Sequence, residues 1–280
     1  VLDYFKNTNE TFYHRMRKTG SLRHLLVRQA FFTKQIVIGL VTSSQLNTDL
    51  NNLKENLLNL KLDGEIKGIL HIINDSSADV VKADKINFIY GNDYFYEKLL
   101  GLDFKISLFS FFQTNSAGAE KLYSIVKKFV GEVYNQTVFD LYCGTGTIAQ
   151  IVAKEAKKVI GVELVEEAVE AAKINAKLNN IENCEFIAGD VYKVVQDLNI
   201  TPDLIILDPP REGINPKAID KIVDFNSNRI VYISCKASSL AKDLKAFIEK
   251  GYIVDKIEMM DMFPRTYHVE CVVLLSKVQN

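Results

Sequence analysis

Acidic side chains follow three consecutive predicted strands in the second half of the chain. They are Glu163, Asp190 and Asp208. The carboxyl ends of parallel strands lie along one edge of a sheet, so we expect these groups to converge on one crevice. A carboxylate there can accept hydrogen bonds from a ribose diol, which suits an adenosyl ligand. Asp190 has a second interpretation, as the cap of the helix that follows it.

A glycine turn precedes these carboxylates. Residues 138–141 predict a buried strand, and Gly144 and Gly146 follow it before an amphipathic helix. Such a turn lets backbone N–H groups approach a nucleotide-like cofactor closely. The spacing also matches the nicotinamide dinucleotide fingerprint, and glycine turns with a purely structural use are common, so this segment alone leaves the alternatives open.

A cysteine and another carboxylate stand at two further strand ends. Cys235 lies beside Lys236 just before a predicted helix, a position that favours the thiolate, although a buried inert cysteine is the ordinary alternative. Glu270 enters the otherwise apolar strand 269–276, which is costly unless the charge is paired or used. The prolines in 208–210 stiffen the turn and hold its carboxylate at the crevice.

The strands that position these residues alternate with helices. Six alternations predict a parallel, doubly wound α/β sheet, and a turn between the last two strands predicts an antiparallel hairpin at one side. Seven strands ending in this way resemble the Class I S-adenosylmethionine (SAM) methyltransferase sheet, which is Rossmann-like. The strands are expected near 137–141, 158–163, 184–188, 203–208, 229–234, 253–260 and 269–276.

The chain is long enough for two domains, since it has 280 residues of which 48% are hydrophobic. We predict a smaller α+β domain over 1–112 and a catalytic domain over 113–280, which opens with a helix over 117–133. The first domain is expected to contain strands at 22–29, 34–42, 66–74, 86–91 and 103–108, and a helix at roughly 49–61.

The charge distribution and the cysteine content indicate which partners and which cellular compartment to expect. The net charge of −1 is uninformative, but residues 1–40 carry a basic excess that an RNA or DNA backbone would attract, unless it is only a solvated face. Four scattered cysteines form no zinc or disulfide pattern, so we expect no metal and a reducing cytoplasm. With no signal peptide or long apolar run, we expect no membrane partner. We also expect a monomer. The chain begins without Met, which suggests an N-terminally truncated fragment.

Six segments, in order, resemble the RNA uracil-5-methyltransferase family, whose members methylate uridine C5 in the tRNA T-loop or in 23S rRNA. The segments are Leu-Arg-His at 22–24, Phe-Phe-Gln-x-Asn at 111–115, Asp-x-Tyr-Cys-Gly-x-Gly at 140–146, Asp-Pro-Pro-Arg at 208–211, Ser-Cys at 234–235 with Asp243-Leu244, and Phe-Pro-x-Thr-x-His-x-Glu at 263–270.

The resemblance implies SAM as the cofactor, RNA as the partner, and methylation of a uridine at C5, with 23S rRNA as the expected RNA and the tRNA T-loop as the alternative. It implies that Cys235 is the nucleophile and Glu270 the general base. The cofactor residues that it implies are Gln113, Tyr142, Gly144, Thr147, Glu163, Asp190 and Asp208. Candidate substrate residues are Arg211, Phe263, Tyr267 and His268, although core packing is the ordinary role for Phe263.

Three residues depart from the family pattern: Lys236 and Ala237 replace an Asn-Pro pair, and Lys242 replaces an arginine. Loss of the proline should loosen the nucleophile's turn, and an ammonium is a poorer bidentate donor than a guanidinium. Two other classes therefore stay in view. A catalytically impaired RNA-binding paralogue would explain the departures, and a dinucleotide oxidoreductase would explain the glycines but would leave Cys235 and Glu270 without roles.

Overall fold

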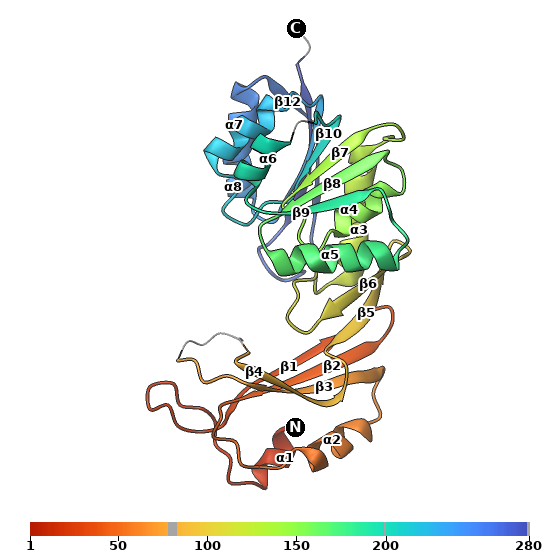
Figure 1. Cartoon of the computed structure of the whole chain (residues 1–280). Coiled ribbons are helices and arrows are strands. Elements are labelled where there is room, and N and C mark those ends of the chain that lie inside the picture. Colours follow the sequence, from red (N-terminus) through yellow and green to blue (C-terminus); the bar gives the residue numbers. More distant parts are fainter. Residues whose placement is uncertain (78–82, 199, 279–280) are drawn as a thin grey trace. The chain divides into compact units, whose positions relative to one another are not determined.

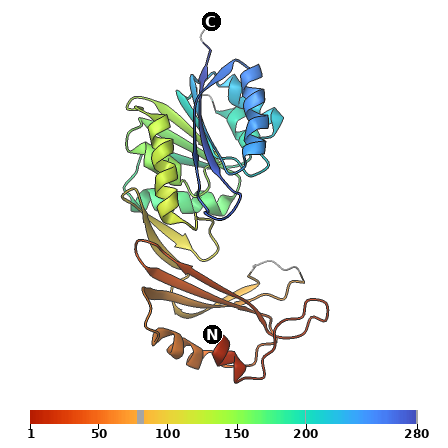
Figure 2. The ribbon, with the colours of Figure 1, turned by 180° about the vertical axis from the view of Figure 1, so that it is seen from behind.

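The structure is a computed structural model that describes residues 1–77, 83–198 and 200–278. The chain divides into two compact units, one of residues Val1–Lys98 and Lys105–Ser110 and the other of Leu99–Phe104 and Phe111–Asn280. Figures 1 and 2 show the ribbon from opposite sides. In the described part of the chain, no helix is both long and apolar enough to cross a bilayer.

The first unit is built on a four-stranded sheet with the order β1-β2-β3-β4. The parallel pair β2 and β3 is connected through α2 in a βαβ arrangement, and β1 and β4 flank it as antiparallel edges. Helix α2 buries Leu53 and Leu57 against Ile38 and Ile69 of the central strands. The elements are α1 (Leu2–Lys6), β1 (Leu22–Gln29), β2 (Gln35–Thr42), α2 (Asn51–Leu58), β3 (Glu65–Ile73) and β4 (Lys85–Gly91).

One strand of this region was not predicted from the sequence. The strand β5 (Tyr94–Leu99) pairs with β6 (Leu102–Ser107), for which no partner was foreseen. Its pattern is obscured because Glu97 is buried within it. The Glu97 carboxylate accepts hydrogen bonds from the backbone N–H groups of Phe31 (2.6 Å) and Phe32 (3.0 Å), so a charged residue occupies a position that an apolar pattern would need.

The second unit contains a seven-stranded sheet with the order β12-β13-β11-β10-β7-β8-β9. All seven predicted strands are present, and only β13 runs against the others, so the predicted mixed sheet with an antiparallel last strand is confirmed. The strands are β7 (Thr137–Leu141), β8 (Lys158–Glu163), β9 (Cys184–Ala188), β10 (Leu204–Leu207), β11 (Arg229–Ser234), β12 (Tyr252–Met260) and β13 (Glu270–Lys277).

Helices cover both faces of this sheet (Figures 1 and 2). One face carries α3 (Ser116–Val130), α4 (Thr147–Ala153) and α5 (Glu166–Leu178), and the other carries α6 (Val191–Asp197), α7 (Pro216–Asp224) and α8 (Ala237–Glu249). The central strands β7, β10 and β11 are buried on both faces and are mostly apolar. Their rigid carboxyl edge is where the predicted site residues lie.

Candidate active site

The register of the last strands places Cys235 and Glu270 together. Strands β11 and β13 pair antiparallel, with Ser234 opposite Cys271. Cys235 directly follows Ser234 and Glu270 directly precedes Cys271, so both residues lie at the same end of this strand pair. The charge of Glu270 acts on the Cys235 thiol there. Because β13 runs against the sheet, its first residue lies at the edge where the parallel strands end.

Asp208 belongs to the same cluster. Burial, and then the charge of Glu270, raise the pKa of Asp208 to about 7. Burial also raises the pKa of Glu270, while Arg211 opposes that shift. The charge of Glu270 thus opposes the ionisation of Asp208 and adds to the effect of burial.

The residues around Cys235 in the sequence predicted thiolate character, and the structure contradicts that prediction. Burial, followed by the charge of Glu270, raises the pKa of the Cys235 thiol, and Arg211 lowers it by a smaller effect. The neighbouring Lys236 is exposed and does not compensate. The surroundings of Cys235 therefore disfavour the thiolate, and the two carboxylates that contribute to this, Glu270 and Asp208, are not visible in the sequence of this strand.

The glycine turn after β7 has an unusual backbone. Tyr142, Gly144 and Gly146 all have positive φ angles of 66°, 53° and 71°. A non-glycine residue in this region is strained, and such strain clusters at ligand sites. A Cβ added at Gly144 would meet nothing within 4 Å, whereas one at Gly146 would lie 2.6 Å from the Phe186 ring. Gly146 is thus needed for packing, and Gly144 borders open space.

Glu163 is tied to this turn. Its Oε2 accepts a hydrogen bond from the Gly144 N–H (3.0 Å), and its Oε1 accepts one from the Val165 N–H (2.9 Å). Each oxygen keeps a further lone pair for a hydroxyl donor. Asp190 lies at the end of the next strand and caps α6 by accepting from the Lys193 N–H (3.3 Å), which is its alternative interpretation. Thr147 is buried at the first residue of α4.

Asp140 lies beneath the turn and opens the motif at 140–146, but the sequence alone assigned it no role. Asp140 is fully buried, and within the described residues neither of its oxygens makes a well-formed hydrogen bond. Burial, then the charge of Asp208, raise its pKa well above the usual range. Open space over Gly144, free lone pairs on Glu163 and an excess of carboxylates together fit a ribose-bearing cation such as SAM.

The Phe-Phe-Gln-x-Asn segment closes the other side. Gln113 lies within hydrogen-bonding reach of the buried Tyr123 hydroxyl, whose pKa is raised by burial and by Asp208. Asn115 caps α3 through the Gly118 N–H (2.9 Å) and donates to the Met262 carbonyl (2.8 Å). Tyr123 was not foreseen, because a tyrosine on the apolar face of a helix reads as core.

The candidate substrate residues gather near Glu270. Arg211 Nη2 donates to His268 Nδ1 (3.0 Å), and the ring centroids of Tyr267 and His268 are 4.1 Å apart. The Tyr267 side chain is 89% exposed. The half-buried Phe263 instead begins a turn, because its carbonyl accepts from the Thr266 N–H (3.1 Å), and no ring contact of Phe263 with the other three is found among the described residues.

Helix α8 holds the loop that carries Arg211. Ser239 Oγ donates to the Arg211 carbonyl (2.7 Å), and the buried Asp243 carboxylate accepts from the Ile214 N–H (2.8 Å) and the Tyr232 hydroxyl (2.7 Å). In the turn without the family proline, the Ser234 hydroxyl bonds the backbone of Lys236 at 3.2 Å. Ala237 begins α8, and Lys242 is exposed on it.

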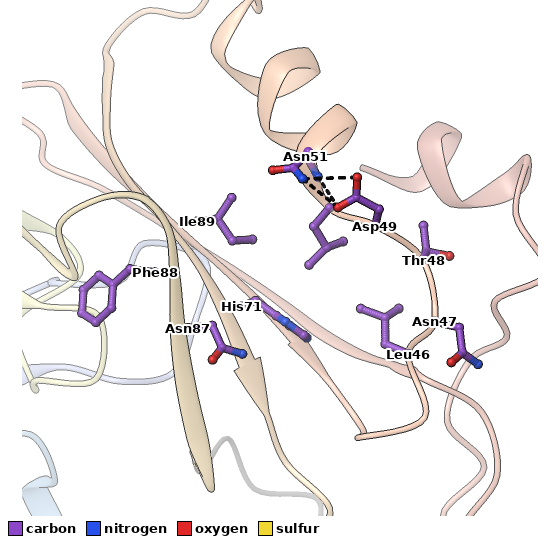
Figure 3. Close-up of a pocket in the computed structure, with 10 residues that line it drawn as sticks. Leu46, Asn47, Thr48, Asp49, Asn51, His71, Asn87, Phe88 and Ile89 are labelled. Atoms are coloured by element: carbon purple, nitrogen blue, oxygen red, sulfur yellow. Dashed lines mark hydrogen bonds between the residues drawn. The ribbon is translucent and has the colours of Figure 1, made fainter.

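A separate cavity of about 470 Å³ lies in the first unit between residues 46–51 and strands β3 and β4 (Figure 3). Its polar groups are largely satisfied internally: the Asn51 amide donates to Asp49 (3.0 Å), and His71 Nε2 lies 2.8 Å from the Thr42 hydroxyl. Its lining includes no predicted site residue. No group of three or more metal-ligating side chains occurs among the described residues.

Comparison with known proteins places these features in a family. Residues 6–278 match the family described as tRNA (Uracil-5-)-methyltransferase. The chain belongs to this family. Uncharacterized RNA methyltransferases of Clostridium tetani and Caldanaerobacter subterraneus are 55% and 50% identical to it over 277 residues, which is 99% of this chain and 61% and 62% of theirs. The chain thus spans about three fifths of the length of these curated relatives.

Solved structures agree with this assignment. The Pyrococcus abyssi tRNA (uracil-54, C5)-methyltransferase in complex with S-adenosyl-L-homocysteine has a TM-score of 0.83 and 30% identity, covering 98% of this chain and 64% of that one. The Methanocaldococcus jannaschii tRNA m1G37 methyltransferase, at 17% identity and a TM-score of 0.58, covers 92% of this chain and 75% of that one and shares the fold.

The two glycines predict a separable pair of variants. Gly146→Ala should lower the free energy of unfolding by about 2–4 kcal/mol, because strain adds to a clash with Phe186. Gly144→Ala should cost only about 1–2 kcal/mol, because it adds strain without a clash. Urea denaturation of both variants measures the difference, and equal losses would contradict the packing role of Gly146.

The raised pKa of Asp208 predicts the sign of a pH dependence. In the unfolded chain this carboxyl ionises near its ordinary value of 3.8, and in the folded chain near 7, so between these values ionisation favours unfolding. The free energy of unfolding of the cofactor-free chain should fall as the pH rises from about 4 to 7. Asp208→Asn should reduce that slope, while Asp261→Asn on an exposed turn serves as the control. An unchanged slope in Asp208→Asn would contradict the raised pKa of Asp208.

Proposed function

We propose that this chain methylates C5 of a uridine in RNA, with SAM as the methyl donor, Cys235 as the nucleophile and Glu270 as the general base. The observation that carries the proposal is that Cys235 and Glu270 lie at the same end of the paired strands β11 and β13, where the charges of Glu270, Arg211 and Asp208 act on the Cys235 thiol. Membership of the uracil-5-methyltransferase family supports it.

Uracil C5 is a poor nucleophile by itself. The reaction therefore requires a nucleophile from the enzyme, which activates C5 by adding to C6. The Cys235 thiol releases its proton to solvent and its sulfur forms a bond to C6, while the electrons of the C5–C6 double bond move to give an enolate whose C5 accepts the methyl group. SAM supplies that methyl on a sulfonium, whose positive charge suits the surrounding carboxylates. Glu270 then removes the C5 proton, the double bond re-forms, and the bond to the Cys235 sulfur breaks.

The target base must leave its stack for this chemistry. That step costs roughly a few kcal/mol, and least in a loop of RNA. The exposed Tyr267 ring and the Arg211 guanidinium offer flat surfaces on which a displaced base can stack. Arg211 Nη2 lies 3.0 Å from His268 Nδ1, so the imidazole ring orients the guanidinium.

The expectation of 23S rRNA as the substrate stays a prediction, with the tRNA T-loop as the alternative. The Pyrococcus relative is named for a tRNA uridine. Mass spectrometry of digested rRNA and tRNA after deletion of the gene identifies the RNA that loses 5-methyluridine. Transfer of tritium from labelled SAM to uridine excludes an inactive paralogue.

The cofactor assignment predicts a loss of affinity in a single variant. Glu163→Ala should weaken SAM binding by about 1.5–3 kcal/mol, about tenfold or more, because it removes charge-assisted hydrogen bonds to the ribose and releases the Gly144 turn. Glu166→Ala is the control, because this glutamate is close to Glu163 in the sequence but lies in the first turn of α5. Calorimetry that gives equal affinities for both variants and the native chain would remove Glu163 from the cofactor site.

The two catalytic assignments predict different failures. Cys235→Ala should form neither methylated product nor RNA–protein adduct, since no bond to C6 is made. Glu270→Gln should add to C6 and accept the methyl group, then stall with the thioether intact. Denaturing electrophoresis with labelled RNA should therefore detect a SAM-dependent adduct in Glu270→Gln alone.

Both outcomes can be contradicted directly. Near-native turnover by a folded Glu270→Gln protein would refute the base assignment. An adduct that persists in Cys235→Ala would point to another cysteine, of which Cys143 is the first to test. Burial, then Asp140 and Glu163, raise the pKa of Cys143, so we expect it to stay unreactive.

A further inference from the structure

A short hairpin of the first unit is held in one conformation. The His14 N–H donates to the Thr19 carbonyl (2.7 Å), and the Lys18 N–H donates to the His14 carbonyl (2.8 Å). The Gln45 side chain clamps the base by accepting from the Gly20 N–H (3.3 Å) and donating to the Lys18 carbonyl (2.9 Å). We call residues 12–20 the basic hairpin.

The basic hairpin presents cations without matching carboxylates. Arg15, Arg17 and Lys18 are exposed, and none of them forms an ion pair with any residue that the structure describes, although Arg15 Nε donates to the Ser77 carbonyl (2.9 Å). The carboxylate nearest in sequence, Glu10, is engaged elsewhere: it accepts from Ser21 Oγ and from the N–H groups of Asn47 (2.9 Å) and Thr48 (3.0 Å). The positive charge of the hairpin therefore faces solvent.

Apolar side chains stand among these cations. The exposed fraction is 86% for Met16 and 71% for Phe12. The backbone hydrogen bonds and the Gln45 clamp hold the base of the hairpin, which lowers the entropic cost of binding through these side chains. A partner that fits must offer several negative charges and, between them, flat apolar faces. An RNA strand with unstacked bases offers both.

From these observations we infer that the basic hairpin is an RNA-binding element, in which Arg15, Arg17 and Lys18 contact phosphates and Met16 packs against an unstacked base. The inference rests on the proposed function, because the RNA that it holds is the substrate. It names a contact outside the candidate active site, so the two can fail separately.

The test compares two triple variants of equal charge change. Arg15→Ala/Arg17→Ala/Lys18→Ala removes the hairpin cations, and Lys6→Ala/Lys61→Ala/Lys85→Ala removes three exposed lysines elsewhere in the same unit. Affinity for transcripts of tRNA and of 23S rRNA is measured across a salt series. The hairpin variant should bind about tenfold more weakly or worse at ~0.1 M salt, and the slope of log K against log salt should shrink by about 2 to 3. Equal losses in both triple variants, or no loss in the hairpin variant, would overturn the inference.

The stacking contact has its own variant. Met16→Ala should weaken RNA binding by about fivefold or more without changing the salt slope, because a base contact releases no counterions. Leu60→Ala, another exposed apolar residue at 53% exposure, should have no effect. If Met16→Ala binds as the native chain does, the base contact is refuted.

The native chain provides a check that needs no variant. Bound RNA should protect Lys18 from acetylation and leave Lys61 reactive, and unprotected Lys18 in the saturated complex would overturn the inference. A 20-residue polyglutamate that competes as well as RNA would identify an acidic protein as the partner instead. Methylation by the native chain with undiminished RNA binding by the hairpin variant refutes the hairpin alone, whereas RNA binding that depends on the hairpin without any methylation refutes only the proposed function.

Discussion

The candidate active site depends on the antiparallel insertion of β13 between β11 and β12. In a parallel sheet, the residues that follow the strands gather at one edge, and a strand's first residue lies at the opposite edge. Reversing β13 brings its first residue, Glu270, to the edge that Cys235 and Asp208 occupy. A parallel β13 would place Glu270 a full strand length away.

That arrangement concentrates negative charge. Asp140, Asp208 and Glu270 all have raised pKa values, and burial is the first cause in each case. Among the named causes, Arg211 is the cation that opposes the shifts at Glu270 and Cys235. The site is therefore electrostatically unfavourable by itself and suited to a positively charged ligand, whose binding would relieve the repulsion.

Local hydrogen bonds hold the loops of the site in place. Asn115 connects α3 with the segment before β13 through the Met262 carbonyl, and Ser239 and Asp243 hold the loop of Arg211 from α8. None of these three is expected to touch the reacting atoms. They fix loops on rigid elements, which a site needs if groups from six strands are to keep their distances.

Much of this was accessible from the sequence. The seven strands of the sheet and the helices between them follow from local apolar runs and turn residues, which report local structure because strand and helix periods are set within a few residues. The glycine turn, the Asp-Pro-Pro segment and Cys235 were recognisable by their residue types at strand ends. The strand β5 was missed because its buried Glu97 serves a turn distant in sequence.

The sequence by itself determined the order of the elements and the residues available for chemistry, since both are encoded in short segments. Only the tertiary structure decided the environment of those residues. The pKa of the Cys235 thiol is raised by burial and then by Glu270, which lies 35 positions later in the chain but at the same end of the paired strands. Likewise, Glu163 binds the Gly144 amide, and Tyr123 of an apolar helix face reaches Gln113. Burial and the charges of distant residues set the pKa values and the partners, and these are properties of packing that no single segment contains.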